Sequence, residues 1–287
     1  MHDTRMQMQQ VQGHDGAVIA VEIGGDPAGP GVVLLHGGGQ TRYAWGDAAN
    51  VLVKKGYRVA TYDLRGHGDS DWAPEGDYTL DTQVADLHAV TTLFRTAPAL
   101  IGSSFGGLIA LTAAGESPSC ASALVLVDVT PKVDRDGEAK IIGFMRAYPS
   151  GFESVEQAAN AISSYLPHRP RPRDLSGLQR NLRQHGNRWY WHWDPRLFDS
   201  LDVLGDTATA RFERAARSIE IPTLLVRGTR SELVDEANAE SFLALVPHAR
   251  RTDMSDAHHM VAGDRNDAFN QAVLEFLGDI RLPIPEI

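Results

Sequence analysis

The chain has 287 residues, of which 43% are hydrophobic, and it carries a formal net charge of -10. This composition is typical of a globular protein that is large enough to bury a sizeable core. The acidic balance argues against a nucleic-acid partner, because phosphate groups repel an acidic surface. The single cysteine, Cys120, excludes an intrachain disulfide and a multi-cysteine metal site.

The first twelve residues, MHDTRMQMQQVQ, contain no apolar stretch of the kind found in secretory signals. No run in the chain approaches the roughly 18 consecutive apolar residues that a membrane-spanning helix needs. We therefore expect a cytoplasmic protein without a membrane partner. The sequence leaves the oligomeric state open.

Short apolar runs alternate with helical patterns through the first half of the chain. The apolar runs cover residues 31–37, 57–66, 98–103, 122–129 and, after a long interruption, 221–228. The helical patterns cover residues 45–56, 79–94 and 106–115, and later 235–246 and 264–277. Continuous apolar runs are typical of strands buried on both faces of a parallel sheet. The alternation predicts an α/β protein with a doubly wound, mostly parallel sheet.

Two further strands complete the predicted core. Residues 17–25 are expected to form one arm of an antiparallel edge, and residues 249–254 the last strand. Between them, residues 131–220 hold helix-like pieces and a turn-rich, arginine-rich stretch, without a convincing core strand. We expect these residues to form a helical cap inserted into a core domain made of residues 1–130 and 221–287.

The stretch GSSFG places a serine between an apolar strand and a helix of small residues. Ser104 has Gly102 and Gly106 two residues away on either side, whereas a register centred on Ser103 would need other glycines. Flanking glycines permit a tight turn that exposes the serine hydroxyl. The amides at the start of the following helix favour developing negative charge. We therefore predict Ser104 as a nucleophile.

A serine nucleophile needs backbone donors for the oxyanion that forms when it attacks a carbonyl. The stretch LLHGGGQ follows the first core strand and offers the N–H groups of Gly37, Gly38 and Gly39. We expect the oxyanion to be held by the N–H of Gly38 and by that of Phe105, the residue after the nucleophile. Gly37 and Gly39 are further candidates for substrate contacts.

The motifs LLHGGG, YDLRGHGDS, IGSSFGG, LVLVDVTP, LLVRGTRSELV and HHMVAGD, in this order, resemble the α/β-hydrolase superfamily over almost the whole chain. The resemblance implies a catalytic triad in the order serine, acid, histidine, and it identifies the insertion as a lid. A serine at the turn argues against the dehalogenase and epoxide hydrolase branches, which use an aspartate there. No metal or organic cofactor is implied.

The resemblance places the triad acid just after the penultimate core strand. Glu232 occupies this place, where an aspartate is commoner in the family. Two other carboxylates remain open as alternatives. Asp128 ends the earlier strand 122–129, and Asp235 lies three residues beyond Glu232.

The histidine of the triad belongs to a doublet, His258 and His259. Neighbouring residues in an extended segment point in opposite directions, so only one of them can face Ser104. By resemblance, the histidine that directly precedes MVAGD is the base, which assigns His259. His258 is then a residue of the rim or a substrate contact.

These roles imply hydrolysis of a carboxylic ester of a small molecule through an acyl-enzyme. Lactonases, C–C bond hydrolases, and perhydrolases or cofactor-free haloperoxidases use the same triad, so these activities remain alternatives. From a different class, a ligand-binding receptor with this fold is the non-catalytic alternative.

The cap carries two features with two interpretations each. Six arginines lie between residues 168 and 188, among them Arg169 and Arg171. They form either a solvated face with salt bridges or a site for a substrate carboxylate, as in an acidic monoester. The aromatic stretch RWYWHWDP packs the cap's own core or lines a substrate pocket, with Trp191 as the candidate contact.

Overall fold

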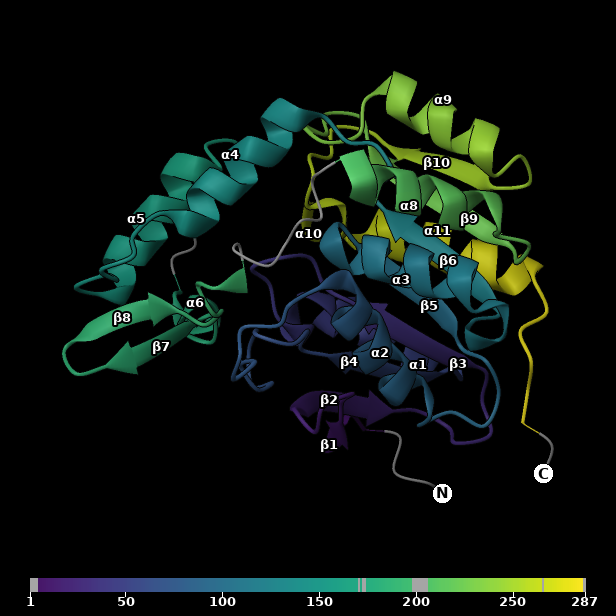
Figure 1. Ribbon diagram of the computed structural model, residues 1–287, viewed down its shortest axis with the longest axis horizontal. Coiled ribbons are helices and arrows are strands. Elements are labelled where there is room, and N and C mark those ends of the chain that lie inside the picture. The colour runs from purple at the N-terminus through teal and green to yellow at the C-terminus, as the bar shows by residue number, and fades with distance from the viewer. Residues whose placement is uncertain (1–4, 170, 172–173, 198–205, 265, 286–287) are drawn as a thin grey trace.

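The computed structural model describes residues 5–169, 171, 174–197, 206–264 and 266–285. Within this part of the chain, an eight-stranded sheet lies at the centre (Figure 1). The first two strands run antiparallel, and the other six are parallel to one another. Across the sheet, the strands are β1 (Gln7–Gln12), β2 (Val18–Gly24), β4 (Arg58–Tyr62), β3 (Gly31–Leu35), β5 (Ala99–Ser103), β6 (Ala123–Val127), β9 (Thr223–Gly228) and β10 (Arg250–Met254).

Helices cover both faces of this sheet (Figure 1). One face carries α1 (Gly46–Lys54) and α11 (Asn266–Asp279), and the other carries α2 (Leu80–Thr91), α3 (Phe105–Glu116), α8 (Asp206–Arg217) and α9 (Glu236–Leu245). Val33 and Leu35 of β3 pack into the hydrophobic cluster beneath the second group of helices, while Val32 and Leu34 pack into the cluster beneath the first. The central strands β3 and β6 are apolar throughout because both of their faces are buried. The predicted doubly wound, mostly parallel sheet is confirmed.

Three short helices join these elements, namely η1 (Arg42–Trp45), η2 (Pro118–Cys120) and α10 (Val261–Asp264). The edge of the sheet is formed by β1, which lies outside the predicted edge strand β2. The apolar-run pattern does not predict β1, because its sequence QMQQVQ is mostly polar and its side chains are mostly exposed.

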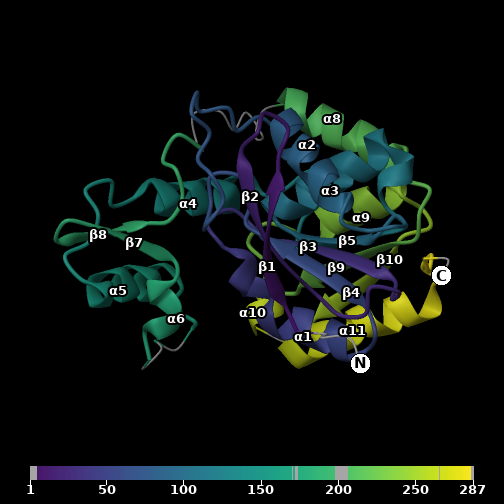
Figure 2. The ribbon, with the colours of Figure 1, turned by 90° about the horizontal axis from the view of Figure 1, so that it is seen from below.

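The elements that follow β6 stand apart on one side of the core in both ribbon views (Figures 1 and 2). They are α4 (Arg135–Arg146), α5 (Val155–Tyr165), α6 (Ser176–Gln179), β7 (Leu182–His185) and β8 (Arg188–Trp191). The last two form an antiparallel hairpin, which the expected helical cap does not include. A two-residue Gly186–Asn187 connection between two strand-forming segments is a hairpin signal, and Gly186 has a φ of 60°.

The helix α8 packs on the core, although the expected cap extends to residue 220. Its Phe212 and Ala216 belong to the same buried cluster as α3. Gly115 of α3 faces the backbone of α8 so closely that an added Cβ would lie 2.6 Å from the Cα of Ala215. Among the described residues, the part that stands apart from the core therefore ends before α8.

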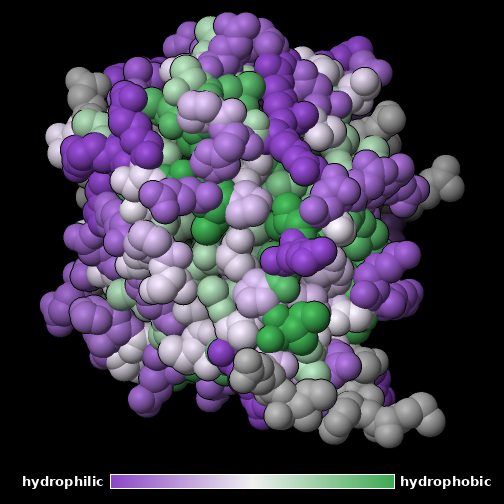
Figure 3. All heavy atoms as spheres, turned by 90° about the vertical axis from the view of Figure 1, so that its right-hand side faces the viewer, coloured by the Kyte–Doolittle hydropathy of each residue, from purple (hydrophilic) through white to green (hydrophobic). Residues whose placement is uncertain are grey.

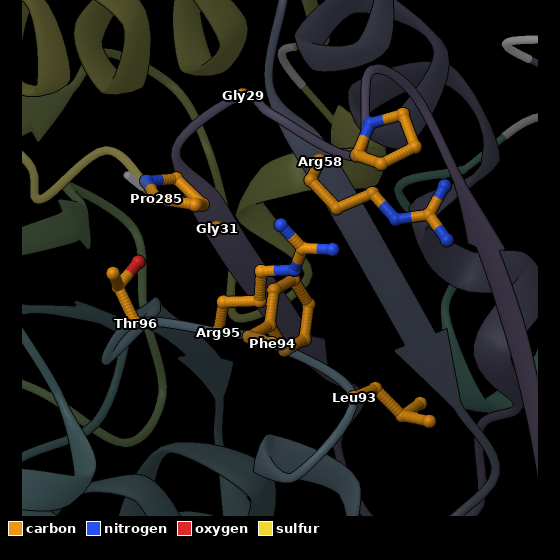
Figure 4. A pocket seen from close by; sticks show the side chains of 9 residues that line it. Gly29, Gly31, Arg58, Leu93, Phe94, Arg95, Thr96 and Pro285 are labelled. Carbon is orange, nitrogen blue, oxygen red and sulfur yellow. The ribbon is translucent and has the colours of Figure 1, made fainter. Parts of the chain in front are cut away.

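Two other surfaces show little that could define a site. The face opposite the cap carries mostly hydrophilic or intermediate residues, and its hydrophobic residues occur in small separate groups (Figure 3). A cavity of about 100 Å³ lies at the amino end of β3, between Gly31, Arg58 and the segment 93–96 (Figure 4). It has room for only a few water molecules.

None of the helices in the described part of the chain is long and apolar enough to cross a membrane.

The contact between α3 and α8 leads to a testable prediction. Substituting Gly115→Ala should lower the free energy of unfolding by about 1–3 kcal/mol, because the new methyl group overpacks a rigid helix contact. Gly278→Ala in α11 is the matched control, since an added Cβ there meets no atom within 4 Å. The control should leave the stability unchanged or raise it slightly, because alanine favours a helix over glycine.

Urea unfolding followed by circular dichroism measures both variants. Equal stability of the two variants would contradict the close packing of α8 on α3.

Candidate active site

Ser104 lies at the sharp turn between β5 and α3, with φ 50° and ψ -123°. This positive φ is strained for a residue with a side chain. The flanking glycines are required by close contacts, since a Cβ at Gly102 would lie 2.5 Å from the Gly106 oxygen, and a Cβ at Gly106 would lie 2.6 Å from the Leu35 oxygen. The turn predicted from GSSFG is therefore present. Within the described chain, the Ser104 hydroxyl makes no hydrogen bond to a protein group.

The glycine loop that follows β3 leaves one amide without a partner. The N–H of Gly37 donates to Gln40 Oε1 at 3.0 Å, and the N–H of Gly39 donates to His67 Nε2 at 3.1 Å. The N–H of Gly38 has no protein acceptor among the described residues. The N–H of Phe105 is the first of α3, and the first amides of a helix lack intrahelical partners. Both predicted oxyanion donors are thus available.

A buried histidine fixes the direction of the Gly38 amide. The N–H of Leu64 donates to His36 Nε2 at 2.9 Å, so the proton of the ring lies on Nδ1, which donates to the Gly37 oxygen at 2.8 Å. The Gly37 carbonyl and the Gly38 N–H belong to one planar trans peptide and point in opposite directions. Holding the carbonyl of Gly37 therefore aims the amide of Gly38. Burial lowers the pKa of His36 to about 4, which keeps the ring neutral.

Each member of the histidine doublet has its own carboxylate. His259 Nδ1 lies 2.8 Å from Asp128 Oδ2, and His258 Nδ1 lies 2.8 Å from Glu232 Oε1. The sequence predicts that Glu232 pairs with the His259 ring. In the structure, Glu232 pairs with His258 instead. Glu232 reaches only the backbone N–H of His259, with its Oε2 at 3.4 Å.

The two carboxylates differ in burial and in support. The Asp128 side chain is 0% exposed and accepts hydrogen bonds from the Gly228 amide and the Ser231 hydroxyl, whereas the Glu232 side chain is 45% exposed. Burial raises the pKa of Glu232, but the hydrogen bond and charge of His258, together with the backbone amides of Glu232 and His259, lower the pKa overall. The third candidate, Asp235, caps α9 by accepting the Asn238 N–H at 2.7 Å.

A cavity of about 1060 Å³ lies between the core and the cap. Every residue predicted for the site lines it except Arg171, including Ser104 and His259. Its apolar wall includes Ile141, Phe144, Leu178, Trp191 and Trp193. Within the described chain, no hydrogen bond joins the Ser104 hydroxyl to the His259 ring, a contact that often tightens only when substrate is bound.

Two residues on the cavity wall stack on aromatic rings of the cap. His258 stacks on His168, with ring centroids 3.7 Å apart and an interplanar angle of 14°. Trp191 is buried and stacks on Trp193 at 5.0 Å. Trp191 thus belongs to the cap's own core and to the wall of the cavity, so both interpretations of the aromatic stretch apply.

Some arginines of the cap line the cavity, and others bind protein groups outside it. Arg169 lines the cavity and contacts Met260, whereas Arg171 is exposed and donates to Asn160 Oδ1 at 3.1 Å. Arg180 also lines the cavity and lies over the Tyr43 ring, 5.2 Å from its centroid. Of the others, Arg183 pairs with Asp69, Arg188 binds backbone carbonyls of residues 150 and 151, and Arg173 lies outside the described residues.

Comparisons with known proteins relate most of the chain to one family. The model of a family described as "alpha/beta hydrolase fold" matches residues 30–265. The chain is 30% identical over 275 residues to "Esterase Rv0045c" of Mycobacterium tuberculosis, covering 90% of this chain and 85% of that protein. It is 28% identical to the mouse "sn-1-specific diacylglycerol lipase ABHD11", covering 89% and 83%. A solved structure of the M. tuberculosis esterase superposes with a TM-score of 0.76 at 27% identity, covering 95% of this chain and 92% of that one.

The buried histidines of the glycine loop predict a pH-dependent stability. Burial lowers the pKa of His36 to about 4, and burial together with the repulsion that a protonated His36 would exert lowers the pKa of His67 to about 3. A histidine of the unfolded chain titrates near about 6.5, so the unfolded chain binds more protons below that pH. The free energy of unfolding should therefore fall as the pH is lowered from about 7.5 to about 5.5, by about 1.4 kcal/mol for each histidine.

Urea unfolding at three pH values in this interval measures the slope. Unfolded carboxylates titrate near about 4 and contribute little here. A stability that stays constant over the interval would contradict the neutral, buried state of both rings.

Proposed function

From the premise that the chain belongs to the alpha/beta hydrolase fold family and is a hydrolase acting on ester bonds, we propose that Ser104, His259 and Asp128 cleave a carboxylic ester. One observation carries this proposal, namely the hydrogen bond between the His259 ring and the buried Asp128 carboxylate at the wall of the cavity that Ser104 also lines. This assignment takes the acid from β6 in place of Glu232.

The reaction follows from the roles of these groups. The His259 ring takes the proton of the Ser104 hydroxyl as its oxygen attacks the ester carbonyl carbon. The N–H groups of Gly38 and Phe105 stabilise the negative oxygen of the tetrahedral intermediate. His259 then donates the proton to the leaving alcohol, and an acyl-enzyme remains. A water molecule, activated by His259, releases the acid and restores the serine.

Asp128 suits the task of orienting the imidazole. Its second oxygen is held by the Gly228 amide, so the carboxylate keeps its direction while one oxygen accepts the Nδ1 proton of His259. This bond leaves Nε2 of His259 as the atom that accepts the serine proton. Glu232 supports the rim by holding His258, and it contacts His259 only at the backbone.

The cavity favours an ester with a sizeable apolar acyl or alcohol group. Its volume of about 1060 Å³ exceeds what an acetyl group needs, and its wall is largely aliphatic and aromatic. Lactones are cyclic esters and are served by the same steps. The relatives that carry names of activities include an esterase and a lipase, which favours an ester over a carbon–carbon bond as the group cleaved.

A specific observation favours a substrate with an additional carboxylate. Arg180 lines the cavity, and within the described residues its guanidinium has no carboxylate partner, only the face of Tyr43. A guanidinium in this state can bind a carboxylate through two hydrogen bonds. The sequence hypothesis assigns the carboxylate site to Arg169 and Arg171. We assign it to Arg169 and Arg180, because Arg171 does not line the cavity.

The triad assignment is tested by two matched amide substitutions. Asp128→Asn should lower kcat for p-nitrophenyl butyrate by about 10³- to 10⁴-fold, because an amide donor at this position favours the wrong tautomer of His259. Glu232→Gln should lower it less than about tenfold. Steady-state kinetics of the two folded variants, beside the inactive control Ser104→Ala, give the comparison.

A larger loss in Glu232→Gln than in Asp128→Asn would return the acid to Glu232. A protein that hydrolyses no p-nitrophenyl or lactone ester, with or without Ser104, would point to the ligand-binding alternative.

The role of Arg180 is tested with a charged and a neutral ester. Arg180→Ala should raise KM about tenfold for mono-p-nitrophenyl succinate and leave KM for p-nitrophenyl butyrate within about twofold, because only the first loses a charge-assisted hydrogen bond. Arg171→Ala is the matched control from outside the cavity, and both KM values should stay unchanged. Equal effects of Arg180→Ala on the two esters would contradict carboxylate recognition.

A further inference from the structure

His192 of the cap reaches into the core, where its two ring nitrogens bind two backbone groups. The N–H of Gly68 donates to His192 Nδ1 at 2.8 Å, so the proton of the ring lies on Nε2, which faces the Gly39 oxygen at 3.3 Å. The side chain is 1% exposed. Burial lowers the pKa of His192 well below its ordinary value, in agreement with a neutral ring that accepts one hydrogen bond and donates another.

Gly39 is consequently held at both of its polar groups by histidines. Its N–H donates to His67 Nε2, and its carbonyl accepts from His192. The rings of His36, His67 and His192 lie in a row, with centroid distances of 5.1 and 5.9 Å. Two of these rings come from the core and the third from the cap.

The segment that carries His192 is fixed on the core independently of this contact. The N–H of Asp194 donates to the Gly66 oxygen at 2.9 Å, and the Tyr78 hydroxyl donates to the Asp194 carboxylate. Arg183 of β7 also donates to the Gly68 oxygen at 2.6 Å. The position of His192 is therefore set by several bonds, and the ring can act as a rigid support.

Gly39 is the residue whose conformation must be controlled if Gly38 is to point its amide at the reacting carbonyl. Gly39 has a φ of 72°, a region that glycine enters and leaves freely. The loop has no side chains of its own between residues 36 and 40, so groups from outside must hold it. His36 holds the peptide before Gly38, and His67 and His192 hold the peptides after it.

We propose that His192 is a positioning residue, through which the cap holds the glycine loop in the conformation that stabilises the oxyanion. The proposal rests on the proposed function, in which the Gly38 amide is an oxyanion donor. It makes the cap part of the support for the transition state, in addition to a wall of the substrate cavity. Losing the bond from His192 releases the Gly39 carbonyl and weakens catalysis without removing any group that touches the substrate.

Two amide substitutions separate the two bonds of His192. His192→Asn places an amide near Nδ1, where it can still accept from Gly68 but does not reach Gly39. His192→Gln places an amide near Nε2, where it can still donate to Gly39 but does not reach Gly68. The kinetic substrate is p-nitrophenyl butyrate.

Two inhibitors distinguish support of the oxyanion from support of the cavity. The ketone 4-phenyl-1,1,1-trifluorobutan-2-one forms a tetrahedral adduct with an activated serine, and its oxyanion needs the same donors as the transition state. The methyl ketone 4-phenylbutan-2-one occupies the cavity without a stable adduct. The ratio of the two inhibition constants reports on formation of the adduct, including its oxyanion donors, separately from the fit to the cavity.

His192→Asn is expected to lower kcat 10- to 100-fold with KM within threefold, and to weaken the trifluoromethyl ketone by a similar factor. The inhibition constant of the methyl ketone for His192→Asn should stay within twofold of the wild-type value. His192→Gln should keep most of the wild-type ratio between the two inhibition constants. Equal weakening of both ketones in folded His192→Asn, or no change in either, overturns the proposal.

If His192→Asn does not fold, the test rests on His192→Gln. A tenfold loss in the ratio of the two inhibition constants for that variant overturns the proposal. Failure of the proposed function is distinct, because Ser104→Ala would then hydrolyse the ester as fast as the wild type.

Discussion

The close approach of α3 to the end of β3 is the constraint on which the site depends. An added Cβ at Gly106 would lie 2.6 Å from the Leu35 oxygen, so only glycine lets the start of the helix come this near. The approach brings the first amides of α3 beside the glycine loop that leaves β3. It also forces Ser104 into a positive φ, a strain of about 1–3 kcal/mol that the packed sheet on both sides must sustain. The proposed nucleophile and the two proposed oxyanion donors are thus placed by one contact.

Burial distinguishes the two carboxylates that pair with the histidine doublet. Both follow parallel strands that lie side by side in the sheet, Asp128 after β6 and Glu232 after β9. Asp128 lies directly after the carboxyl end of β6 with a φ of 51°, and its two oxygens are held by Gly228, Ser231 and His259. In this low-dielectric position, a charge orients the imidazole more strongly than an exposed carboxylate does. Glu232 is nearly half exposed, and its partner His258 stacks on the cap.

The sequence predicts those parts of the site that local geometry determines. Ser104 follows from glycine spacing on a strand–turn–helix segment, and the doubly wound sheet follows from apolar runs that alternate with helices. The partner of His259 cannot be found in this way, because two carboxylates on neighbouring strand ends differ only in how deeply the fold buries them. The β7–β8 hairpin has a local signal in Gly186–Asn187, but the surrounding arginines and aromatics obscure the alternation of a strand. The helix α8 has the pattern of any amphipathic helix, and its contacts with Gly115 and with the buried cluster beneath α3 place it on the core.

The histidines around the glycine loop explain why a catalytic loop without side chains can be rigid. A neutral imidazole carries one donor and one acceptor on opposite sides of a rigid ring, so it can bridge two backbone groups that do not reach each other. His36, His67 and His192 each do this with both nitrogens. Each ring must stay neutral to do this, because a protonated imidazole has no nitrogen lone pair left to accept a hydrogen bond from a backbone N–H. The same burial that favours the neutral rings therefore holds the loop in one conformation, and it ties the stability of the fold to the geometry of the proposed oxyanion donors. Because one of the three rings comes from the cap, the cap and the glycine loop form a single framework.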